Sequence, residues 1–313
     1  MALVSSKEML RRARAGGYAV GAFNTSNLEI TQAIVSAAVK LRSPVMIATS
    51  QSAIAYAGAE AMYRMVRTVA EEADVPIALH LDHGTDLAVI EDCIARGWTS
   101  IMIDASAKPY EENVALTRRV VETAHARSVP VEAEIGQLKG VEDQVRVSEA
   151  EAHLTDPEEA RRFADETGCD TLAVAVGTSH GAYKFKGEAK LALGRLKAIA
   201  ERVPLPLVLH GASGVPADVL ERAQRFGLTI AGAKGVPESE ITEAVNLGVS
   251  KINIDTDLRL AFTGAVREIL TTKTDVFDPR KILGPARDAM GDVVERKIKL
   301  FGSVGKADSP TGV

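Results

Sequence analysis

The sequence predicts an α/β protein, a single (β/α)8 TIM barrel followed by a C-terminal helical extension. Eight short apolar runs alternate with amphipathic stretches of helical length, and no change in composition divides the 313 residues. A polar or titratable residue also stands at the end of each run, where barrel enzymes carry their active sites. A doubly wound open sheet is the alternative, but no G-x-G-x-x-G motif follows an early strand.

The elements follow from the spacing of apolar residues and from capping signals. Asn27 is a predicted N-cap, Thr85 is another, and Gly97 is the matching helix stop. Asp156 and Pro157 suit the start of a further helix. The eight predicted strands are 18–23, 44–48, 76–80, 99–103, 129–133, 171–176, 205–209 and 250–254.

The remaining segments are a long connection and a tail. Residues 136–147 form a polar loop with several glycines, longer than a plain connection requires. An amphipathic helical tail is predicted for about 275–300, and a flexible end for about 302–313. We expect residues 1–313 to form one domain.

Composition excludes several classes of protein. Hydrophobic residues make up 46% and charged residues 25%, as in ordinary globular proteins, and no apolar run approaches the ~20 residues that span a membrane. The net charge of −5 argues against broad nucleic-acid binding. The N-terminus has no secretory pattern, and two cysteines, Cys93 and Cys169, give no disulfide framework. A cytoplasmic location is therefore expected.

Polar residues stand at all eight strand ends. Four of the six histidines lie at three of these ends. Because the carboxyl ends of parallel barrel strands meet on one face, we expect these side chains to converge. The strand-end residues are Asn24, Ser50, Asp82 with His83, Asp104, Glu134, His180, His210, and Asn253 with Asp255.

Three of the histidines suit a catalytic metal centre. His83, His180 and His210 come from different strands, and three imidazoles with an open position are a common ligand set for catalytic zinc. No H-x-x-x-H spacing supports this locally, so the prediction depends on the barrel. Each histidine alone also fits a hydrogen-bonded core residue, which is the interpretation we favour for His80.

Glycines beside these histidines suggest an anion site. Glycine follows both His180 and His210, and glycine lets backbone N–H groups approach a phosphate closely. An extra predicted helix begins at Pro237, as near many barrel phosphate sites. The alternative is that these glycines are plain turn residues. Glu142 and Asp143 in the long loop suit either a mobile general base or solvated charges.

These groups together suit carbon-acid chemistry on a phosphorylated sugar. A metal would polarise a carbonyl and stabilise an enediolate, and Asp82 would move the proton of the hydroxyl on the cleaved carbon. A Schiff-base route would need a lysine near a strand end. Lys251 stands near the start of its strand, which is the wrong end.

Five motifs in order resemble the class II fructose-bisphosphate aldolase family over nearly the whole chain. They are L-D-H-G (81–84), V-E-A-E-I-G (131–136), G-T-S-H-G (177–181), L-H-G-A-S-G (209–214) and K-I-N-I-D-T-D (251–257). The resemblance implies zinc bound by His83, His180 and His210, with Asp82 as the proton donor. It also assigns Asp104 and Glu134 to a second divalent-metal position.

The resemblance assigns substrate roles as well. Glu142 matches the loop glutamate that takes a proton from dihydroxyacetone phosphate, although Val141 stands where some relatives have a second glutamate. Ser50 matches a contact to the aldehyde, and Asn24 is expected to bind substrate. The dihydroxyacetone-phosphate site would consist of Gly181, Gly211, Ala212, Ser213, Asn253, Ile254, Asp255 and Thr256.

The implied reaction is reversible cleavage of fructose 1,6-bisphosphate to dihydroxyacetone phosphate and glyceraldehyde 3-phosphate, in glycolysis and gluconeogenesis. Family members are homodimers or homotetramers and often use Na+ or K+. Tagatose-1,6-bisphosphate aldolase is the nearest alternative, although Asp255 resembles the fructose form because tagatose enzymes tend to carry alanine there. A non-catalytic phosphosugar-binding protein and a metal-dependent hydrolase are more remote alternatives.

Overall fold

The computed structural model describes residues 3–136, 139–142, 145–147, 153–180, 190–230 and 235–308. For residues 139–142, 145–147, 179 and 180, only the backbone is described below. Gly181, which the sequence assigns to the substrate site, and Asp143 lie outside the described residues.

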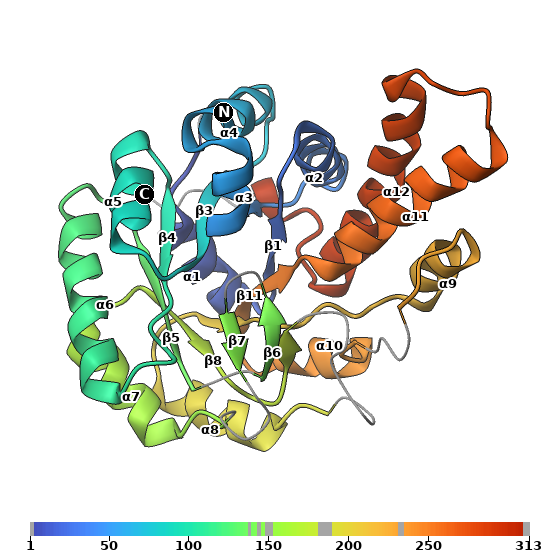
Figure 1. Ribbon diagram of the computed structural model, residues 1–313. Coiled ribbons are helices and arrows are strands. Elements are labelled where there is room, and N and C mark those ends of the chain that lie inside the picture. The colour runs from blue at the N-terminus through green and yellow to red at the C-terminus, as the bar shows by residue number, and fades with distance from the viewer. Residues whose placement is uncertain are drawn as a thin grey trace.

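Eight parallel strands close into a barrel, which confirms the predicted fold class (Figure 1). Around the barrel, the strand order is β1-β11-β10-β8-β5-β4-β3-β2. Each predicted strand corresponds to one of these, with ends shifted by a few residues. The strands are β1 Val20–Asn24, β2 Val45–Ser50, β3 Ile77–Gly84, β4 Ser100–Ile103, β5 Val131–Ile135, β8 Thr171–Val174, β10 Leu207–Leu209 and β11 Val249–Ile254.

Helices surround the barrel and connect its strands (Figure 1). The first ones are α1 Ser6–Gly16, α2 Leu28–Lys40, α3 Gln51–Ala57, α4 Ala59–Glu71, α5 Leu87–Arg96 and α6 Tyr110–His125. The later ones are α7 Pro157–Thr167, α8 Leu193–Arg202, α9 Ala217–Arg225, α10 Glu238–Asn246, α11 Thr256–Thr272 and α12 Pro279–Leu300, with a short 3-10 turn at Lys306–Asp308.

Capping is as predicted at three of the four helix ends considered. The Asn27 side chain caps α2, the Asp156 side chain caps α7, and Gly97 ends α5 with a φ of 110°. The prediction of Thr85 as the N-cap of α5 is wrong. Asp86 accepts the hydrogen bond from the backbone N–H of Ala88 at 2.8 Å, whereas the Thr85 hydroxyl accepts one from the Gln51 amide.

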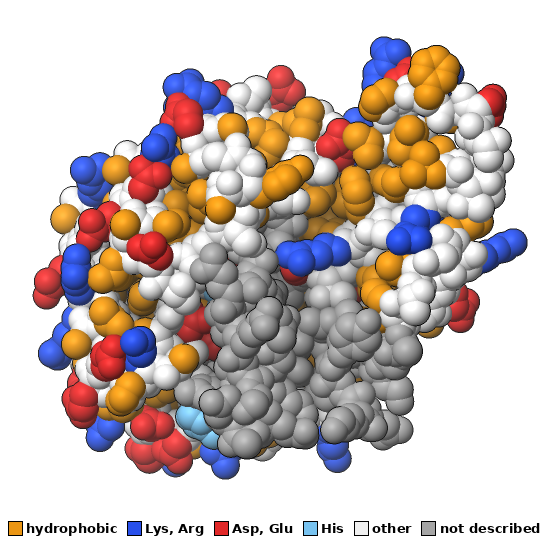
Figure 2. Space-filling model, viewed as in Figure 1, with side chains coloured by type: hydrophobic (Ala, Val, Ile, Leu, Met, Phe, Trp, Pro, Cys, Tyr) orange, Lys and Arg blue, Asp and Glu red, His pale blue; other side chains and the backbone are white. Residues whose placement is uncertain are grey.

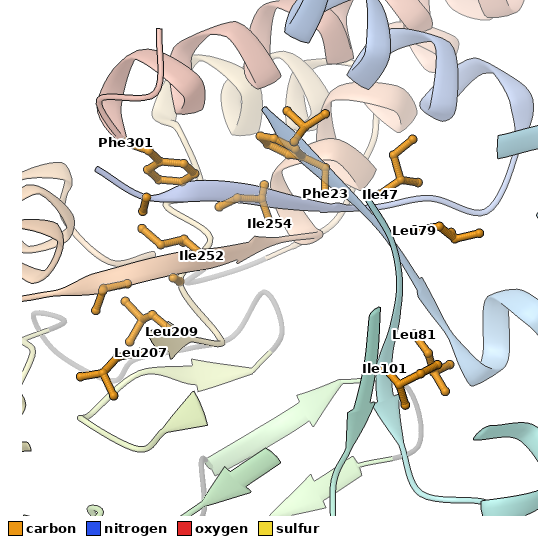
Figure 3. Packing of buried hydrophobic residues seen from close by; sticks show 14 of the residues in the cluster. Phe23, Ile47, Leu79, Leu81, Ile101, Leu207, Leu209, Ile252, Ile254 and Phe301 are labelled. Carbon is orange, nitrogen blue, oxygen red and sulfur yellow. The ribbon is translucent and has the colours of Figure 1, made fainter. Parts of the chain in front are cut away.

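Alternate residues of each strand face the surrounding helices and form the main core. Phe23, Ile47, Leu79 and Ile252 are fully buried in one apolar cluster with the helix side chains (Figure 3). Residues of the other parity point into the barrel. Because the side chains of a strand alternate between its two faces, these inward positions decide what fills the interior.

Helix α1, which the sequence analysis did not identify, packs at the lower end of the barrel. Its buried residues Met9, Leu10 and Ala13 form a second apolar cluster with inward-facing residues near the starts of β1, β2 and β3. Those strand residues are Val20, Ala22, Met46 and Ala78. An apolar layer therefore fills the N-terminal end of the barrel, opposite to the strand ends where the candidate site lies.

The predicted loop at 136–147 contains regular structure. Strands β6 Lys139–Glu142 and β7 Val145–Val147 pair antiparallel, and β6 also pairs in parallel with β9 Ser179–His180. The alternating valines of this segment favour such pairing. Residues 139–142 and 145–147 are therefore neighbouring strands of a three-stranded sheet.

The tail begins as an arm that extends beyond the barrel and then returns to it (Figure 1). Helix α12 packs against α11 and α2. Figure 2 shows hydrophobic side chains gathered between the arm and the neighbouring helices. Among the described residues, no helix is long and apolar enough to cross a membrane.

The described part of the expected flexible end, residues 302–308, contacts the end of α2. The backbone N–H groups of Gly305 and Ala307 donate to the carbonyls of Leu41 and Arg42, at 3.0 and 2.9 Å. Ser303 is fully buried against Ser43. These contacts hold the chain against the end of α2 as far as residue 308.

Candidate active site

Asp82 stands at the centre of the carboxyl ends of the strands. It points into the barrel from β3, and 1% of its surface is exposed. Its two oxygens each accept a hydrogen bond of 2.8 Å, Oδ2 from the Asn24 amide on β1 and Oδ1 from the Asn253 amide on β11. Hydrogen bonds from two other strands therefore fix the orientation of the Asp82 carboxylate.

His83 faces the site because the end of β3 is irregular. Strand alternation would turn His83 away from the barrel interior when Asp82 points inward. Its φ of 47°, in the left-handed region, breaks the alternation. The β3–β4 register also shifts between Leu81 and Gly84. This bulge brings two consecutive side chains to the same site.

The rings of His83 and His210 meet beside Asp82. Their centroids are 4.5 Å apart at an interplanar angle of 65°, and His210 Nδ1 lies 4.0 Å from Asp82 Oδ1. His210 Nε2 lies 2.8 Å from Glu132 Oε1. Because a carboxylate can only accept, Nε2 carries the proton of that hydrogen bond, and Nδ1 is the nitrogen that could bind a metal.

Asp104 and Glu134 lie on the other side of His83. His83 Nδ1 is 2.8 Å from Asp104 Oδ2 and 4.0 Å from Glu134 Oε2. Asp104 also accepts hydrogen bonds from the backbone and hydroxyl of Ser106. A carboxylate that orients a histidine ring in this way is common beside protein-bound metals.

Two groups of these side chains could hold a divalent metal. In Asp82, His83 and His210, and likewise in His83, Asp104 and Glu134, the candidate ligand atoms lie within 4.8 Å of one another, and all five residues are buried. Imidazole nitrogens together with carboxylate oxygens suit zinc and related first-row metals. The donor set therefore fits the metal that the sequence analysis expects.

The charges of the site shift its pKa values in opposite directions. Burial alone would raise the pKa of Asp82, but His83 and His210 outweigh it, so the pKa is lowered. Burial alone would lower the pKa of His83, but Asp82 and Asp104 outweigh it, and the pKa is raised well above its usual range. Asp82 and Asp104 therefore favour the charged form of His83, and His83 in turn favours the charged form of Asp82.

Below the site, a chain of four buried polar side chains lies inside the barrel. Lys251 Nζ lies 2.8 Å from each oxygen of Glu132 and 3.0 Å from His80 Nε2, and His80 Nδ1 is 2.8 Å from Ser100 Oγ. Burial, followed by the charge of Lys251, lowers the pKa of His80 to about 3, so its ring is neutral. Glu132 links this layer to His210.

The segments expected to bind phosphate lie beside Asp82. Gly211 follows β10 with a φ of 61°, and Ala212 and Ser213 are buried. On the neighbouring strand, β11 ends at Ile254, Asp255 is the N-cap residue of α11, and Thr256 is its first residue. Backbone N–H groups at a helix N-terminus favour anions.

A cavity of about 310 Å3 opens beside these segments. Asn24, Ser50 and Asp255 line it together with Arg259, which forms an ion pair of 2.8 Å with Asp255. The Ser50 hydroxyl accepts a hydrogen bond from the backbone of Ala53 at 3.3 Å and so also caps α3. The cavity therefore places Ser50 where it could contact a substrate.

His180 and Glu142 are described by their backbone alone. His180 belongs to β9, where it pairs with Gly140 of β6, and Glu142 is two residues further along β6. The backbone thus brings the segments of the third predicted histidine and the predicted loop base into one small sheet. Their roles remain predictions.

The sequence analysis missed Glu132 as a partner of His210 and gave Lys251 no structural role. One sign of Glu132 was available, because Glu132 and Glu134 alternate in V-E-A-E and must face the same side of β5. The partner of Glu132 could not be identified in this way, since Lys251 lies 119 residues away in the sequence.

Comparisons with known proteins agree with this architecture. The family model described as fructose-bisphosphate aldolase class-II matches residues 4–306. The fructose-bisphosphate aldolase of Thermus caldophilus is 54% identical over 305 residues, which cover 97% of this chain and all of that protein. A D-tagatose-1,6-bisphosphate aldolase subunit of Klebsiella oxytoca is 42% identical over 306 residues, covering 98% of this chain and all of that protein.

Solved structures give the same result. The YdjI aldolase of Escherichia coli K12 superimposes with a TM-score of 0.80 at 32% identity, covering 98% of this chain and all of that one. A protein of Coccidioides immitis described as a fructose-1,6-bisphosphate aldolase superimposes with a TM-score of 0.79 at 32% identity, covering 96% and 97% of the two chains. By its barrel, its motifs and these matches over nearly its whole length, the chain belongs to the class II fructose-bisphosphate aldolase family.

Proposed function

We propose that the protein reversibly cleaves fructose 1,6-bisphosphate to dihydroxyacetone phosphate and glyceraldehyde 3-phosphate. The observation that carries this proposal is Asp82, a buried carboxylate held by two asparagine amides beside the rings of His83 and His210. Membership of the family and the name of the relative at 54% identity support it.

His83, His180 and His210 are the proposed zinc ligands. Asp104 holds Nδ1 of His83, and Glu132 holds Nε2 of His210. In each ring this hydrogen bond sets the direction of the second nitrogen, which would bind the zinc. A zinc ion held there would supply a Lewis acid to polarise the substrate carbonyl and spread the negative charge left by bond cleavage. Asp104 and Glu134 are the proposed ligands of a second divalent position around His83.

Asp82 is proposed to move the proton of the hydroxyl on the cleaved carbon. Its lowered pKa keeps it ionised, so it can accept this proton during cleavage and return it during condensation. The two amides hold the carboxylate while each of its oxygens keeps lone-pair capacity for the substrate. Glu142 is the proposed base that exchanges a proton with dihydroxyacetone phosphate.

The phosphate of dihydroxyacetone phosphate is proposed to lie between two segments. One is the loop at 211–213, and the other is Asn253 to Thr256 at the start of α11, with Gly181 as a further proposed contact. Ser50 is the proposed contact to the aldehyde, and Asn24 lines the same cavity as Ser50 and Asp255.

The test combines activity with metal analysis. The purified protein should cleave fructose 1,6-bisphosphate in a coupled assay, lose this activity on thorough chelation and regain it with zinc. Asp82→Asn should lose at least about a hundredfold in cleavage rate, a usual contribution of a general acid–base group, while metal content stays unchanged. Activity that survives complete metal removal would refute the metal mechanism, and metal loss in Asp82→Asn would refute the role of Asp82.

Tagatose 1,6-bisphosphate is the second candidate substrate because a relative at 42% identity carries that name. We favour fructose because of Asp255. Assaying both sugars with the wild type and with Asp255→Ala would decide between them, since a higher rate with tagatose 1,6-bisphosphate in the wild type would reverse the preference.

The compartment, the assembly and the salt requirement of the enzyme are also proposed. Burial raises the pKa of both cysteine thiols, Cys93 and Cys169, to about 12, and both are buried without a disulfide, which suits the cytoplasm. A homodimer or homotetramer, and stimulation by Na+ or K+, are further proposals from the family resemblance. Light scattering and activity measurements in each salt would test them.

A further inference from the structure

Asp257 is buried directly behind the two segments that are proposed to bind phosphate. It is the last residue of the K-I-N-I-D-T-D motif and the second residue of α11, and none of its surface is exposed. The mechanism proposed above assigns it no role. A fully buried carboxylate needs compensating partners, because an uncompensated charge in the interior is costly.

The first partners of Asp257 are backbone groups of the loop after β10. Its Oδ2 accepts a hydrogen bond from the N–H of Gly214 at 3.1 Å, and its Oδ1 accepts one from the N–H of Val215 at 2.8 Å. One side chain therefore connects the start of α11 with the loop at 211–215. These are the two segments that would contact the substrate phosphate.

The last partner comes from the C-terminal helix. Lys297 of α12 lies 3.0 Å from Asp257 Oδ2, and the two side chains are 4% and 0% exposed. A Cβ atom added to Gly214 would lie 2.8 Å from Lys297 Nζ. The ammonium group therefore packs directly on the loop backbone, and a side chain at position 214 would displace it.

The loop held by these contacts is strained. Val215 has a φ of 46°, a left-handed conformation that β-branched residues rarely adopt. Such a backbone persists only when its surroundings determine it, and it is often found at ligand sites. The N–H of Val236 also donates to the carbonyl of Ser213, at 3.3 Å. The loop is thus fixed from α11, from α12 and from the segment before α10.

We propose that Asp257 and Lys297 are positioning residues for the phosphate group of the substrate, and that α12 serves to hold the phosphate-binding loop. This inference rests on the proposed function. Neither side chain would touch the phosphate. Lys297 neutralises Asp257, Asp257 orients the N–H groups of Gly214 and Val215, and the preceding residues 211–213 are thereby held at the distance from Thr256 that a phosphate requires.

The test compares Lys297→Met with Lys299→Met on the same helix. Lys299 is exposed, and its ion pair with Glu295 is 4.0 Å long, so its loss should change neither kcat nor KM. Lys297→Met should raise KM for fructose 1,6-bisphosphate about tenfold, as expected when one hydrogen bond to a charged group is lost. Its kcat and its metal content should stay close to those of the wild type.

Asp257→Asn/Lys297→Met serves if the single variant does not fold. This pair removes both charges, so no uncompensated charge remains buried. An asparagine amide has only one acceptor atom, so one of the two loop N–H groups still loses its acceptor and faces an NH2 donor instead. KM should therefore remain raised although the protein folds. A folded variant with the wild-type KM would overturn the proposal.

A separate measurement distinguishes this inference from the proposed function. Calorimetric titration with inorganic phosphate reports on the loop without any cleavage, and affinity should fall about tenfold in Lys297→Met but not in Lys299→Met. A wild type that binds phosphate but cleaves no bisphosphate would refute the function alone. Equal phosphate affinity in the wild type and in Lys297→Met would refute the positioning role.

Discussion

Removing one partner of the buried ion pair between Lys251 and Glu132 should destabilise the protein strongly, whereas removing both partners should cost much less. Lys251 Nζ lies 2.8 Å from both carboxylate oxygens, and the side chains are 0% and 1% exposed. Lys251→Met leaves the Glu132 carboxylate in the barrel interior without its cation, while the hydrogen bond from His210 is kept. Breaking one partner of such a pair costs about 3–5 kcal/mol, because the other charge stays buried.

The double variant separates the charges from the packing. In Glu132→Gln/Lys251→Met both formal charges are gone, and the replacements keep similar volumes, so most of the lost stability should return. The measurement is denaturant unfolding of the four proteins at one protein concentration, analysed as a double-mutant cycle. We expect a coupling free energy of about 3 kcal/mol or more.

The control is an ion pair of similar length on the surface. Arg161 and Asp165 of α7 are 2.7 Å apart, but their side chains are 45% and 55% exposed. Their coupling free energy should be about 0.5 kcal/mol or less, because solvent screens them. Equal coupling energies in the two cycles, or single variants of the buried pair that cost less than about 1 kcal/mol, would refute the argument that burial decides the strength.

Three further predictions concern protons. Metal affinity should fall as pH falls below the raised pKa of His83, because a proton then competes with the metal for the ring. Competition with a chelator at several pH values measures this affinity, and a constant affinity would contradict the prediction. Glu142→Ala should slow proton exchange on dihydroxyacetone phosphate by about a hundredfold, measured by NMR in deuterium oxide, and unchanged exchange would exclude it as the base. Burial raises the pKa of Asp170, but hydrogen bonds from Lys7 and His125 outweigh it and lower the pKa. At pH values above the usual aspartate pKa of about 3.9, Asp170→Asn should therefore lower the free energy of unfolding by about 1 kcal/mol. Denaturant unfolding at several pH values should show this loss vanish as pH falls through the lowered pKa of Asp170. A loss that persists in acid would show a cause other than charge.

The barrel and the location of its site could be predicted because both depend on local patterns. A parallel strand buried on both faces gives a short apolar run, and the polar residue that ends it marks the face where the strands converge. Asp82 could be recognised for this reason. The prediction also included His83, although two consecutive residues of a regular strand point to opposite faces. Only the left-handed φ of His83 and the bulge at Leu81 to Gly84 explain how Asp82 and His83 both face the site.

What could not be predicted depends on pairs that are distant in the sequence. Lys251 and Glu132 are 119 residues apart, and the contact of Lys297 with Asp257 joins the tail to the start of α11. A single lysine in a strand or a helix gives no local sign of its partner, because the spacing of residues along one element does not show which residue of a distant element lies opposite. The pairing of β6 with β9 could not be predicted for the same reason, since it joins residues about 40 positions apart.

Inside the barrel, a layer of buried charged and polar groups lies above an apolar layer to which helix α1 contributes. Barrel interiors are usually filled by branched apolar side chains, which contribute hydrophobic stabilisation. Here the middle of the barrel contains Lys251, Glu132 and His80, which orient the site but bury little apolar surface. An apolar layer lies below these polar groups, and there Leu10 of α1 is fully buried against residues of three strands. Helix α1 thus adds apolar contacts beneath the polar groups that support His210.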